Sequence, residues 1–456
     1  MRKQDEFLEL SEKFAFDREH RSRMQVNVHK YEAAFVSAKK QFSNLELARE
    51  RAAYFKWKVI ENLDKYLIEF ESNVIRKGGK VLWADDAKGA LTEITTIINK
   101  HNAKLVVKGK SMITEEIGLN AHLRANGVEV SETDLGEYIV DAANEQPYHM
   151  VTPAMHKTKL EITQLLNAKI GTSIEADPED IAADVAAEVR GKFLKASIGI
   201  TGANFLIADS GMVGVTENEG NARLCLSMPQ VHIVVAGIEK VIPSINDAEL
   251  FFSLLGTYGT GQKITTYNSL VGPRVADDMD GPKEFYVVLV DNGRSNILAQ
   301  HEQRQALGCI RCGACLNVCP VFQNIGGHAY GSTNSGPIGS VWAQHQSGVE
   351  EFKHLSFASP ICGKCTDVCP VKIDIHNHLL RNRKDSVQQG EVKNSEKLMW
   401  YSWKKIMLSR KNMNKGVSIK GFMLKSFFKT AWGERRQFPV LADKSFNQLW
   451  RERFGQ

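Results

Sequence analysis

The spacing of the cysteines constrains this chain more than any other feature of its sequence. Seven of the eight cysteines lie between residues 309 and 369, in two runs that each end in Cys-Pro. The runs are Cys309-x₂-Cys312-x₂-Cys315-x₃-Cys319-Pro320 and Cys362-x₂-Cys365-x₃-Cys369-Pro370. In this spacing three thiolates surround one iron–sulfur cubane, and the fourth, carried away by a helix that starts at the proline, binds a second cubane. The sequence therefore predicts a module that holds two iron–sulfur clusters.

Crosswise pairing assigns a ligand set to each cluster, and the second set is one thiolate short. The first cluster receives four cysteines: Cys309, Cys312, Cys315 and Cys369. The second receives Cys319, Cys362 and Cys365, because Ser359 stands where a complete second run would have cysteine. Three outcomes stay open there: a [3Fe-4S] cluster, a [4Fe-4S] cluster with a non-cysteine fourth ligand, or an iron open to substrate or a partner. We expect the remaining thiol, Cys225, to be a small buried hydrophobic residue.

Two other uses of cysteine fit this sequence poorly. Zinc sites prefer paired Cys-x₂-Cys units without the x₃-Cys-Pro continuation. Disulfide frameworks belong to small secreted domains, whereas this chain has 456 residues and begins with acidic residues where a signal peptide needs an apolar core. No stretch approaches the roughly 20 apolar residues that span a bilayer. We therefore expect a cytoplasmic protein whose thiols hold iron–sulfur clusters.

Chain length and pattern together predict several domains. A chain of 456 residues is too long for a single hydrophobic core. We expect a helical N-terminal extension (residues 1–75), an α/β domain (76–298), an α-helical two-cluster ferredoxin-like module (299–390) and a basic C-terminal tail (391–456).

Short apolar runs alternate with helical stretches in the α/β domain, which is typical of a mostly parallel sheet covered on both faces. The predicted strands are Lys80–Ala84, Lys104–Val107, Val128–Val130, Ser197–Ile200, Phe205–Ala208, Met212–Val215, Val231–Ala236 and Phe285–Val290. The predicted helices are Leu45–Arg76, Ala87–Lys100 and Glu115–Ala125.

Polar residues gather near the ends of several of these strands. Those that we assign to a candidate cofactor or anion pocket are Lys110, Ser111, Thr201, Asn204, Glu217 and Asn218. Ligands of α/β sheets bind beyond the carboxyl ends of the strands, which supports a pocket. Ordinary turn chemistry explains the same residue types, and either Ser111 or Thr114 could cap the helix that follows. We identify no catalytic residue from the sequence.

The tail combines positive charge with aromatic residues. Residues 391–456 hold 15 Lys and Arg against 5 Asp and Glu. The aromatic residues among them include Trp400, Tyr401, Trp403, Phe422, Phe427, Phe428 and Trp432. Without a nucleic-acid-binding signature we exclude nucleic acid as the partner. An acidic protein partner, a membrane surface, and packing of the tail against its own domain with solvated lysines stay open.

Several longer segments resemble the lactate utilization protein B family, the LUD-domain iron–sulfur proteins of bacterial L-lactate oxidation. The segments that carry the resemblance are residues 109–120 (GKSMITEEIGLN), 201–211 (TGANFLIADSG), 214–221 (GVTENEGN), 309–320 (CIRCGACLNVCP) and 362–370 (CGKCTDVCP). The resemblance covers nearly the whole chain, and the tail matches least well. It implies a LUD domain of the ribose-phosphate-isomerase and CoA-transferase-like α/β type, followed by the two-cluster module, and a second run with three cysteines.

The resemblance also implies a function and partners. It implies an electron-transfer subunit of a complex that oxidises L-lactate to pyruvate and enables growth on lactate. The implied partners are a cysteine-rich, glycolate-oxidase-iron–sulfur-like subunit and a second LUD-domain protein. Lactate oxidation releases two electrons, and two one-electron clusters suit that task. Two alternatives stay open: a cluster with an open iron that acts as a Lewis acid on a hydroxy acid, and a non-catalytic iron–sulfur assembly or sensing module.

Overall fold

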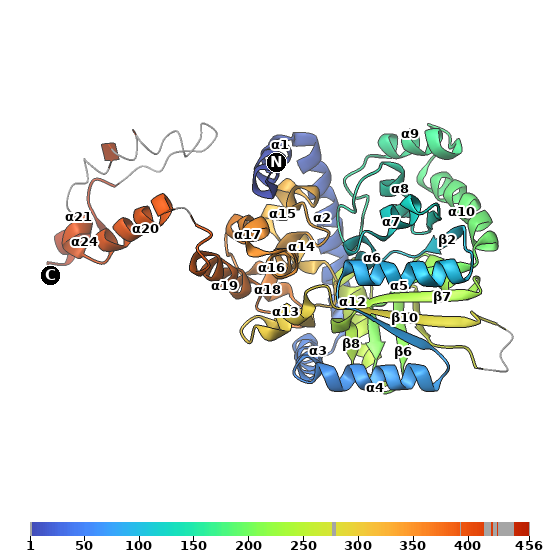
Figure 1. Cartoon of the computed structure of the whole chain (residues 1–456). Coiled ribbons are helices and arrows are strands. Elements are labelled where there is room, and N and C mark those ends of the chain that lie inside the picture. The colour runs from blue at the N-terminus through green and yellow to red at the C-terminus, as the bar shows by residue number, and fades with distance from the viewer. Residues whose placement is uncertain are drawn as a thin grey trace. The chain divides into compact units, whose positions relative to one another are not determined.

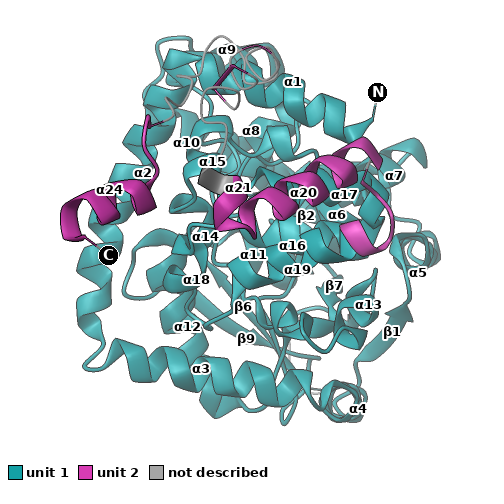
Figure 2. Cartoon of the chain, turned by 90° about the vertical axis from the view of Figure 1, so that its left-hand side faces the viewer, with its two compact units in different colours: residues 1–386 teal, residues 387–456 magenta. Residues whose placement is uncertain are grey.

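The computed structural model of the chain divides into two compact units, residues 1–386 and 387–456 (Figures 1 and 2). The structure describes residues 2–275, 280–392, 394–414, 421–422, 426 and 442–455. Each unit is described by itself below. The divisions that the sequence suggests within residues 1–386 stay a proposal, because these residues form one compact unit.

A six-stranded sheet forms the centre of the α/β region, with every neighbouring pair of strands parallel. In sheet order its strands are β1 (Lys80–Ala84), β10 (Glu284–Val290), β7 (Val231–Gly237), β4 (Ile198–Gly202), β2 (Leu105–Lys108) and β3 (Glu129–Glu132). Every residue of β7 is buried, as the continuous apolar run in its sequence predicts for a strand covered on both faces. The predicted α/β class and mostly parallel sheet are confirmed.

Helices cover both faces of this sheet. On one face, α5 (Ala87–Lys100) and α7 (Leu119–Ala125) pack against Ile233, Val235 and other alternate residues. On the other face, α4 (Leu63–Arg76) packs against Val234 and its neighbours (Figure 1). The side chains of a strand alternate between the two faces, so successive residues of β7 enter different cores.

Two predicted helices are interrupted in the structure. The helical pattern of residues 45–76 forms α3 (Leu45–Ile60) and α4, and Asn62 between them leaves the helical conformation at φ −138° and ψ 40°. The pattern of residues 115–125 forms α6 (Met112–Glu116) and α7, separated by Gly118 at φ 69°. Glycine adopts this left-handed backbone conformation without steric strain, and the chain changes direction there. The apolar residues on both sides keep the helical spacing on which the prediction of one helix rested.

A second, smaller sheet was not predicted as a separate layer. Its order is β8 (Val241–Ile242), β5 (Phe205–Ile207), β6 (Met212–Glu217) and β9 (Tyr267–Val271), and β6 is antiparallel to both of its neighbours. Strand β9 escaped the prediction because all its residues are only half-buried, so its sequence lacks a continuous apolar run.

The N-terminal helices join the α/β region to the cysteine-bearing region. Helix α1 (Lys3–Phe16) contacts α15 and α17, whereas α2 (Arg18–Ala38) contacts both α12 and α15. The helices not yet located are α8 (Leu135–Ala142), α9 (Lys159–Ile170), α10 (Pro178–Lys195), α11 (Asn221–Ser227), α12 (Ile245–Thr260), α13 (Arg294–Ala299), α14 (Ala314–Asn317), α15 (Pro320–Ile325), α16 (Gly336–Ser347), α17 (Val349–Ala358), α18 (Lys364–Val368) and α19 (Ile375–Gln388).

The described part of the second unit consists of exposed helices. These are α20 (Asn394–Met407), α21 (Arg410–Asn414) and α24 (Phe446–Phe454), and neither α20 nor α24 contains a buried residue. Trp400 and Trp403 are 53% and 52% exposed. Three aromatic residues of the predicted tail, Phe427, Phe428 and Trp432, lie outside the described residues. Nowhere in the described chain is a helix both long and apolar enough to cross a membrane.

A close backbone approach at Gly199 in β4 gives a test of the fold. A Cβ atom on Gly199 would lie 1.8 Å from the carbonyl oxygen of Cys225 and 3.1 Å from Pro229. We expect Gly199→Ala to lower the free energy of unfolding by about 3 kcal/mol, because backbone on both sides of the contact must shift. Urea denaturation measures the loss. The control is Gly191→Ala in α10, where nothing lies within 4 Å of the added Cβ and alanine favours the helix. Equal stability of the two variants would contradict the close packing.

Candidate iron–sulfur centres and the adjoining cavity

The first predicted set of cysteines is brought together in the structure. All four line one small, mostly apolar cavity of about 20 Å³. They come from distant parts of the chain: Cys309 and Cys312 precede α14, Cys315 lies within it, and Cys369 follows α18. Met150, Ile310 and Ile338 complete much of the wall. The arrangement matches the crosswise pairing, because Cys369 belongs to the second run and faces the ligands of the first.

The second predicted set also lies together, nearer the surface. Burial, with further contributions from the charges of Cys319 and Cys362, raises the pKa of Cys365 to about 11. Burial likewise raises the pKa of Cys319, and Cys362 contributes to that rise. Cys362 is exposed, whereas Cys319 and Cys365 are buried. The second set therefore has one ligand open to solvent.

Burial and mutual repulsion oppose ionisation of the first set. Burial raises the pKa of Cys369 to about 12, with a further contribution from Cys309. Burial also raises the pKa of Cys312 and of Cys315, and neighbouring thiolates act in the same direction. Several buried thiolates need a strong positive charge beside them, which iron supplies when it binds. This donor set fits an iron–sulfur cluster.

The thiols are spaced too widely for a single zinc ion. Within the residues that the structure describes, one group of three potential ligands has its atoms within 4.8 Å of one another, and it contains no cysteine. A tetrahedral zinc ion with Zn–S bonds of about 2.3 Å would bring its sulfur ligands to roughly 4 Å. A cluster with several iron atoms spans a wider set, so the geometry favours the prediction of iron–sulfur chemistry over zinc.

The second cysteine run repeats the backbone of the first. The backbone N–H of Arg311 donates to the Cys309 sulfur at 3.4 Å, and that of Ile361 donates to the Ser359 hydroxyl oxygen at 3.1 Å. Arg311 and Ile361 have similar left-handed φ values, 61° and 55°. Ser359 therefore occupies the place of Cys309 in the second run. The spacing of the second run predicts this position for Ser359. The turn at Ile361 holds the Ser359 oxygen in the same way as the turn at Arg311 holds the Cys309 sulfur.

A larger cavity of about 350 Å³ lies beyond the carboxyl ends of the parallel strands. All six residues predicted for a ligand pocket line it: Lys110, Ser111, Thr201, Asn204, Glu217 and Asn218. Lys110 and Ser111 follow β2, and Thr201 lies in β4. The sheet thus places the six residues around one space, as the rule for parallel sheets predicts. Their role in binding a ligand stays a proposal.

Most acidic groups of this cavity already have partners. Arg294 makes a bidentate pair with Glu116 at 2.9 and 3.1 Å and a second ion pair with Glu239 at 2.5 Å. Glu217 accepts hydrogen bonds from two backbone N–H groups at the start of α11, at 2.7 and 2.9 Å. Asp134 accepts one from the N–H of Glu137 at 3.0 Å. These carboxylates are therefore held by the fold.

Ser111 does not have the capping role that its sequence position suggested. It occupies the N-cap position of α6, but its side chain makes no capping hydrogen bond. The residue is only 6% exposed, and its buried hydroxyl oxygen has no hydrogen-bond partner among the residues that the structure describes. The hydroxyl of Thr114 donates to the backbone oxygen of Ser111 instead. A buried hydroxyl without a partner in a cavity wall is available to a ligand.

The large cavity adjoins the first cysteine set. Met150 lines both cavities, and Arg311, between Cys309 and Cys312 in the chain, lines the larger one. Arg311 stacks on Trp342, with its guanidinium carbon 4.1 Å from the ring centre. Burial lowers the pKa of Lys240 in the cavity wall to about 8, although Glu239 and Cys309 oppose the shift. One continuous region therefore joins the sheet ends to the first cluster site.

Sequence reasoning missed several residues of this region. Lys240, Arg294 and Glu239 follow the carboxyl ends of β7 and β10, so the rule for parallel sheets could have found them. Arg311 had no such signal, since it comes from the cysteine run and reaches the cavity only through tertiary packing. The prediction for Cys225 is confirmed: it is fully buried, and burial raises its pKa to about 12.

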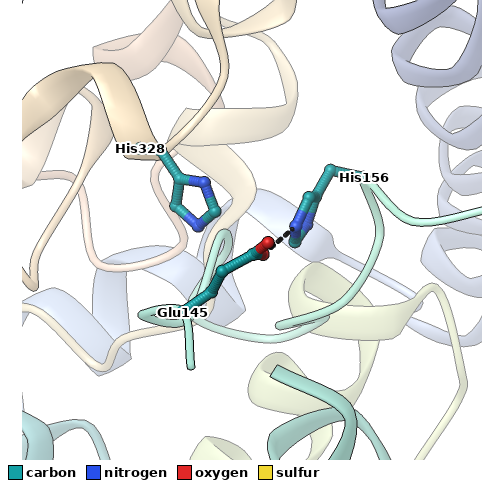
Figure 3. A group of neighbouring side chains, drawn as sticks. All are labelled: Glu145, His156 and His328. Carbon is teal, nitrogen blue, oxygen red and sulfur yellow. Dashed lines mark hydrogen bonds and ion pairs between the residues drawn. The ribbon is translucent and has the colours of Figure 1, made fainter. Parts of the chain in front are cut away.

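Glu145, His156 and His328 form the compact group noted above (Figure 3). His156 Nε2 lies 2.7 Å from a Glu145 oxygen, and Lys157 pairs with the other carboxylate oxygen. His328 Nε2 donates to the backbone oxygen of Gln146 at 2.8 Å. The positive charge of Lys157 and the existing hydrogen bonds give this group a structural role, in which a loop of the α/β region contacts the cysteine-bearing region.

We expect this group to make the protein sensitive to acid. Burial lowers the pKa of His156 to about 4, from an ordinary value of about 6.5. The unfolded chain therefore takes up a proton near pH 6.5 that the folded chain takes up only near pH 4, so stability present above pH 6.5 falls as the pH drops to 4. The loss is at most about 3 kcal/mol for this group. Urea midpoints at pH 7 and pH 5 measure it.

A variant pair isolates the contribution of His156. His156→Asn should retain more of its pH 7 stability at pH 5 than the unaltered protein does. His29→Asn alters an exposed histidine and serves as the control, with unchanged acid sensitivity. Identical pH dependence in both variants would show that His156 does not titrate between the two states.

Comparison with known proteins identifies the family. The family model for the LUD domain matches residues 67–290, and the model for a 4Fe-4S dicluster domain matches residues 305–373. One relative, named lactate utilization protein B, from Geobacillus sp. strain WCH70, is 40% identical over 457 residues, covering 94% of this chain and 96% of its own. Relatives of the same name from Bacillus licheniformis and Bacillus subtilis are each 44% identical over 366 residues, or 80% of this chain and 76% of theirs. The chain therefore belongs to the lactate utilization protein B family, with a LUD domain followed by a 4Fe-4S dicluster domain.

Proposed function

We propose that this chain is the iron–sulfur electron-transfer subunit of a complex that oxidises L-lactate to pyruvate. The observation that carries the proposal is the convergence of Cys309, Cys312, Cys315 and Cys369 on one buried cavity. Such a site holds a cluster that accepts one electron at a time, and the protein contributes its position and surroundings. Residues Ile310, Ile338 and Met150 exclude water from it, and backbone N–H groups face the sulfurs.

The two sets differ in exposure, which suggests a direction for electron transfer. The first set lies against the large cavity, and the second has the exposed ligand Cys362. The charge of Cys365 contributes to the raised pKa of Cys315, which supports placing the two sets side by side. Electrons would enter at the first site and leave through the second, where a partner can approach.

Both sites would hold [4Fe-4S] clusters, and Ser359 would stand at the fourth ligand position of the second. Its hydroxyl is aligned by the N–H of Ile361 as the Cys309 sulfur is by that of Arg311. A serine oxygen is a weaker ligand than a thiolate, so the iron beside it would be the first to leave. Ser359→Cys should make the second cluster more resistant to oxidation, whereas Ser359→Ala should favour a [3Fe-4S] form.

The complex would contain two further proteins in the cytoplasm, a cysteine-rich glycolate-oxidase-iron–sulfur-like subunit and a second LUD-domain protein. The exposed aromatic and basic residues of α20, including Trp400 and Trp403, would contact an acidic partner or a membrane surface. For contact with an acidic partner or with a membrane surface, the tail does not need to pack against its own domain, which was the third possibility that the sequence left open.

Electron paramagnetic resonance with iron and sulfide analysis tests the proposal on anaerobically purified protein, with and without the two partners and L-lactate. We expect about eight iron atoms per chain, and reduction of the clusters by lactate only in the full complex. About seven iron atoms with an oxidised three-iron signal would instead favour an open second site and Lewis-acid chemistry. Clusters that lactate never reduces, in protein that still binds its partners, would indicate an assembly or sensing module and overturn the proposal.

A further inference from the structure

We propose that the cavity beyond the strand ends binds the carboxylate of a small 2-hydroxy or 2-oxo acid, through Lys240, Lys110 and Ser111, beside the first cluster site. The identity of the acid rests on the proposed function, which makes lactate and pyruvate the candidates. The existence of an anion site rests on the cavity itself.

The sign of the ligand charge follows from the groups that remain without partners. The carboxylates of Glu116 and Glu239 are paired with Arg294, and Glu217 accepts two backbone N–H groups. Across the described residues, no carboxylate lies within salt-bridge distance of the ammonium groups of Lys110 and Lys240. The other acids of the wall, Asp134, Glu217 and Glu219, accept backbone N–H groups, so a negative ligand can supply the counter-charge that Lys110 and Lys240 lack.

The donors lie on separate elements that converge on one space. Lys110 and Ser111 follow β2, and Lys240 follows β7, two strands away in the sheet. The Lys110 ammonium donates to the backbone oxygen of Val151, which holds the side chain in place and leaves two of its protons for a ligand. The buried Ser111 hydroxyl has no other partner among the described residues. Three donors of this kind suit a carboxylate, and charge-assisted bonds to it are strong.

The size and the polar wall of the cavity suit a small hydroxy acid. A volume of about 350 Å³ exceeds that of a three-carbon acid and leaves room for several waters of about 30 Å³ each. Asn204 also lines the cavity, and its amide oxygen accepts from the N–H of Thr216, which leaves its amide nitrogen to donate to the 2-hydroxyl or 2-oxo oxygen. Arg311 and Met150 form the side toward the cysteines, so a bound acid lies next to the first cluster site.

Calorimetric titration of the anaerobic, cluster-loaded full chain tests the proposal. L-Lactate, pyruvate and inorganic phosphate are titrated separately, each into the unaltered protein and its variants. We expect lactate or pyruvate to bind, and Lys240→Gln to weaken the binding by about tenfold or more, the usual effect of losing a hydrogen bond to a charged group. Ser111→Ala, a smaller change that keeps the fold, should weaken it severalfold. The control is Lys263→Gln, an exposed lysine outside the cavity lining, with unchanged affinity.

A redox titration provides a second readout that depends on the position of the site. A bound carboxylate places negative charge beside the first cluster, so it should lower the midpoint potential of that cluster and leave the second less affected. Lys240→Gln should lose this shift at ligand concentrations that saturate the unaltered protein.

The outcomes separate this proposal from the proposed function. If neither lactate nor pyruvate binds the cluster-loaded chain, the cavity proposal is wrong, while reduction by lactate in the full complex would still support electron transfer. If phosphate alone binds with the same dependence on Lys240, the ligand carries a phosphate group and the assignment to a 2-hydroxy acid is overturned. If binding is unchanged in both Lys240→Gln and Ser111→Ala, the acid binds elsewhere.

Discussion

Replacing Cys369 by alanine, which offers no ligand atom, should remove the cluster of the first cysteine run, although Cys369 belongs to the second. We expect the iron content to fall from about eight atoms per chain to about four. The remaining electron paramagnetic resonance signal should match that of Cys309→Ala, because both residues line the same cavity. Lactate-dependent reduction in the reconstituted complex should be lost in both variants, since electrons would enter at this site.

Matched variants make this result specific to the crosswise pairing. Cys319→Ala should resemble Cys362→Ala, because these two belong to the second set. Cys225→Ala removes a fully buried thiol that is no cluster ligand and should keep all the iron. A Cys369→Ala protein whose remaining signal matches that of Cys362→Ala would refute crosswise pairing and show that each run holds its own cluster.

Replacing Arg294 by methionine should destabilise the first unit by about 3–5 kcal/mol, the cost of leaving buried charges without their partner. Arg294 is 1% exposed and binds Glu116 through two hydrogen bonds and Glu239 through a third. Its neighbour Arg311 lies 3.8 Å from Glu239 and cannot replace it on Glu116. The buried carboxylate of Glu239 and the largely buried one of Glu116 would lose their main counter-charge, and both line the large cavity.

Urea denaturation of the cluster-loaded protein measures this loss, and an exposed ion pair supplies the control. Arg304 pairs with Glu61 at 3.3 Å, with side chains 23% and 34% exposed. Arg304→Met should therefore cost less than about 1 kcal/mol. A similarly small effect in Arg294→Met would mean that water or Arg311 compensates the two carboxylates, and that the network is not a main support of the cavity.

Periodicity predicts the α/β region well because its strands are buried on both faces. Residues 231–236 and 285–290 are almost wholly apolar, and their short length and their β-branched and aromatic residues favour strands over a buried helix. The partly exposed strand β9 and the break between α3 and α4 were not predicted, because the sequence pattern at these two places does not favour a single kind of element. There the local sequence permits more than one conformation, and contacts with distant residues select among them.

For the two cysteine sets as well, the sequence predicts some properties and only the structure shows others. The spacing within each run predicts which thiols share a site. In crosswise pairing, each site combines neighbouring positions of one run with the last cysteine of the other run. Spacing cannot show that Cys362 is exposed while Cys312 is buried. Exposure depends on which helices cover each run, and α1, α2 and α16 come from elsewhere in the chain.

The sequence by itself predicted which cysteines would lie together, the class of the sheet and the polar residues at the strand ends, because each follows from local spacing or period. Only the tertiary structure decided that Arg311 enters the same cavity as Lys240, that Ser111 has no hydrogen-bond partner among the described residues, and that Arg294 pairs with both Glu116 and Glu239. These juxtapositions join residues far apart in the chain. They arise from packing the cysteine-bearing region against the carboxyl ends of the sheet, which no local pattern encodes.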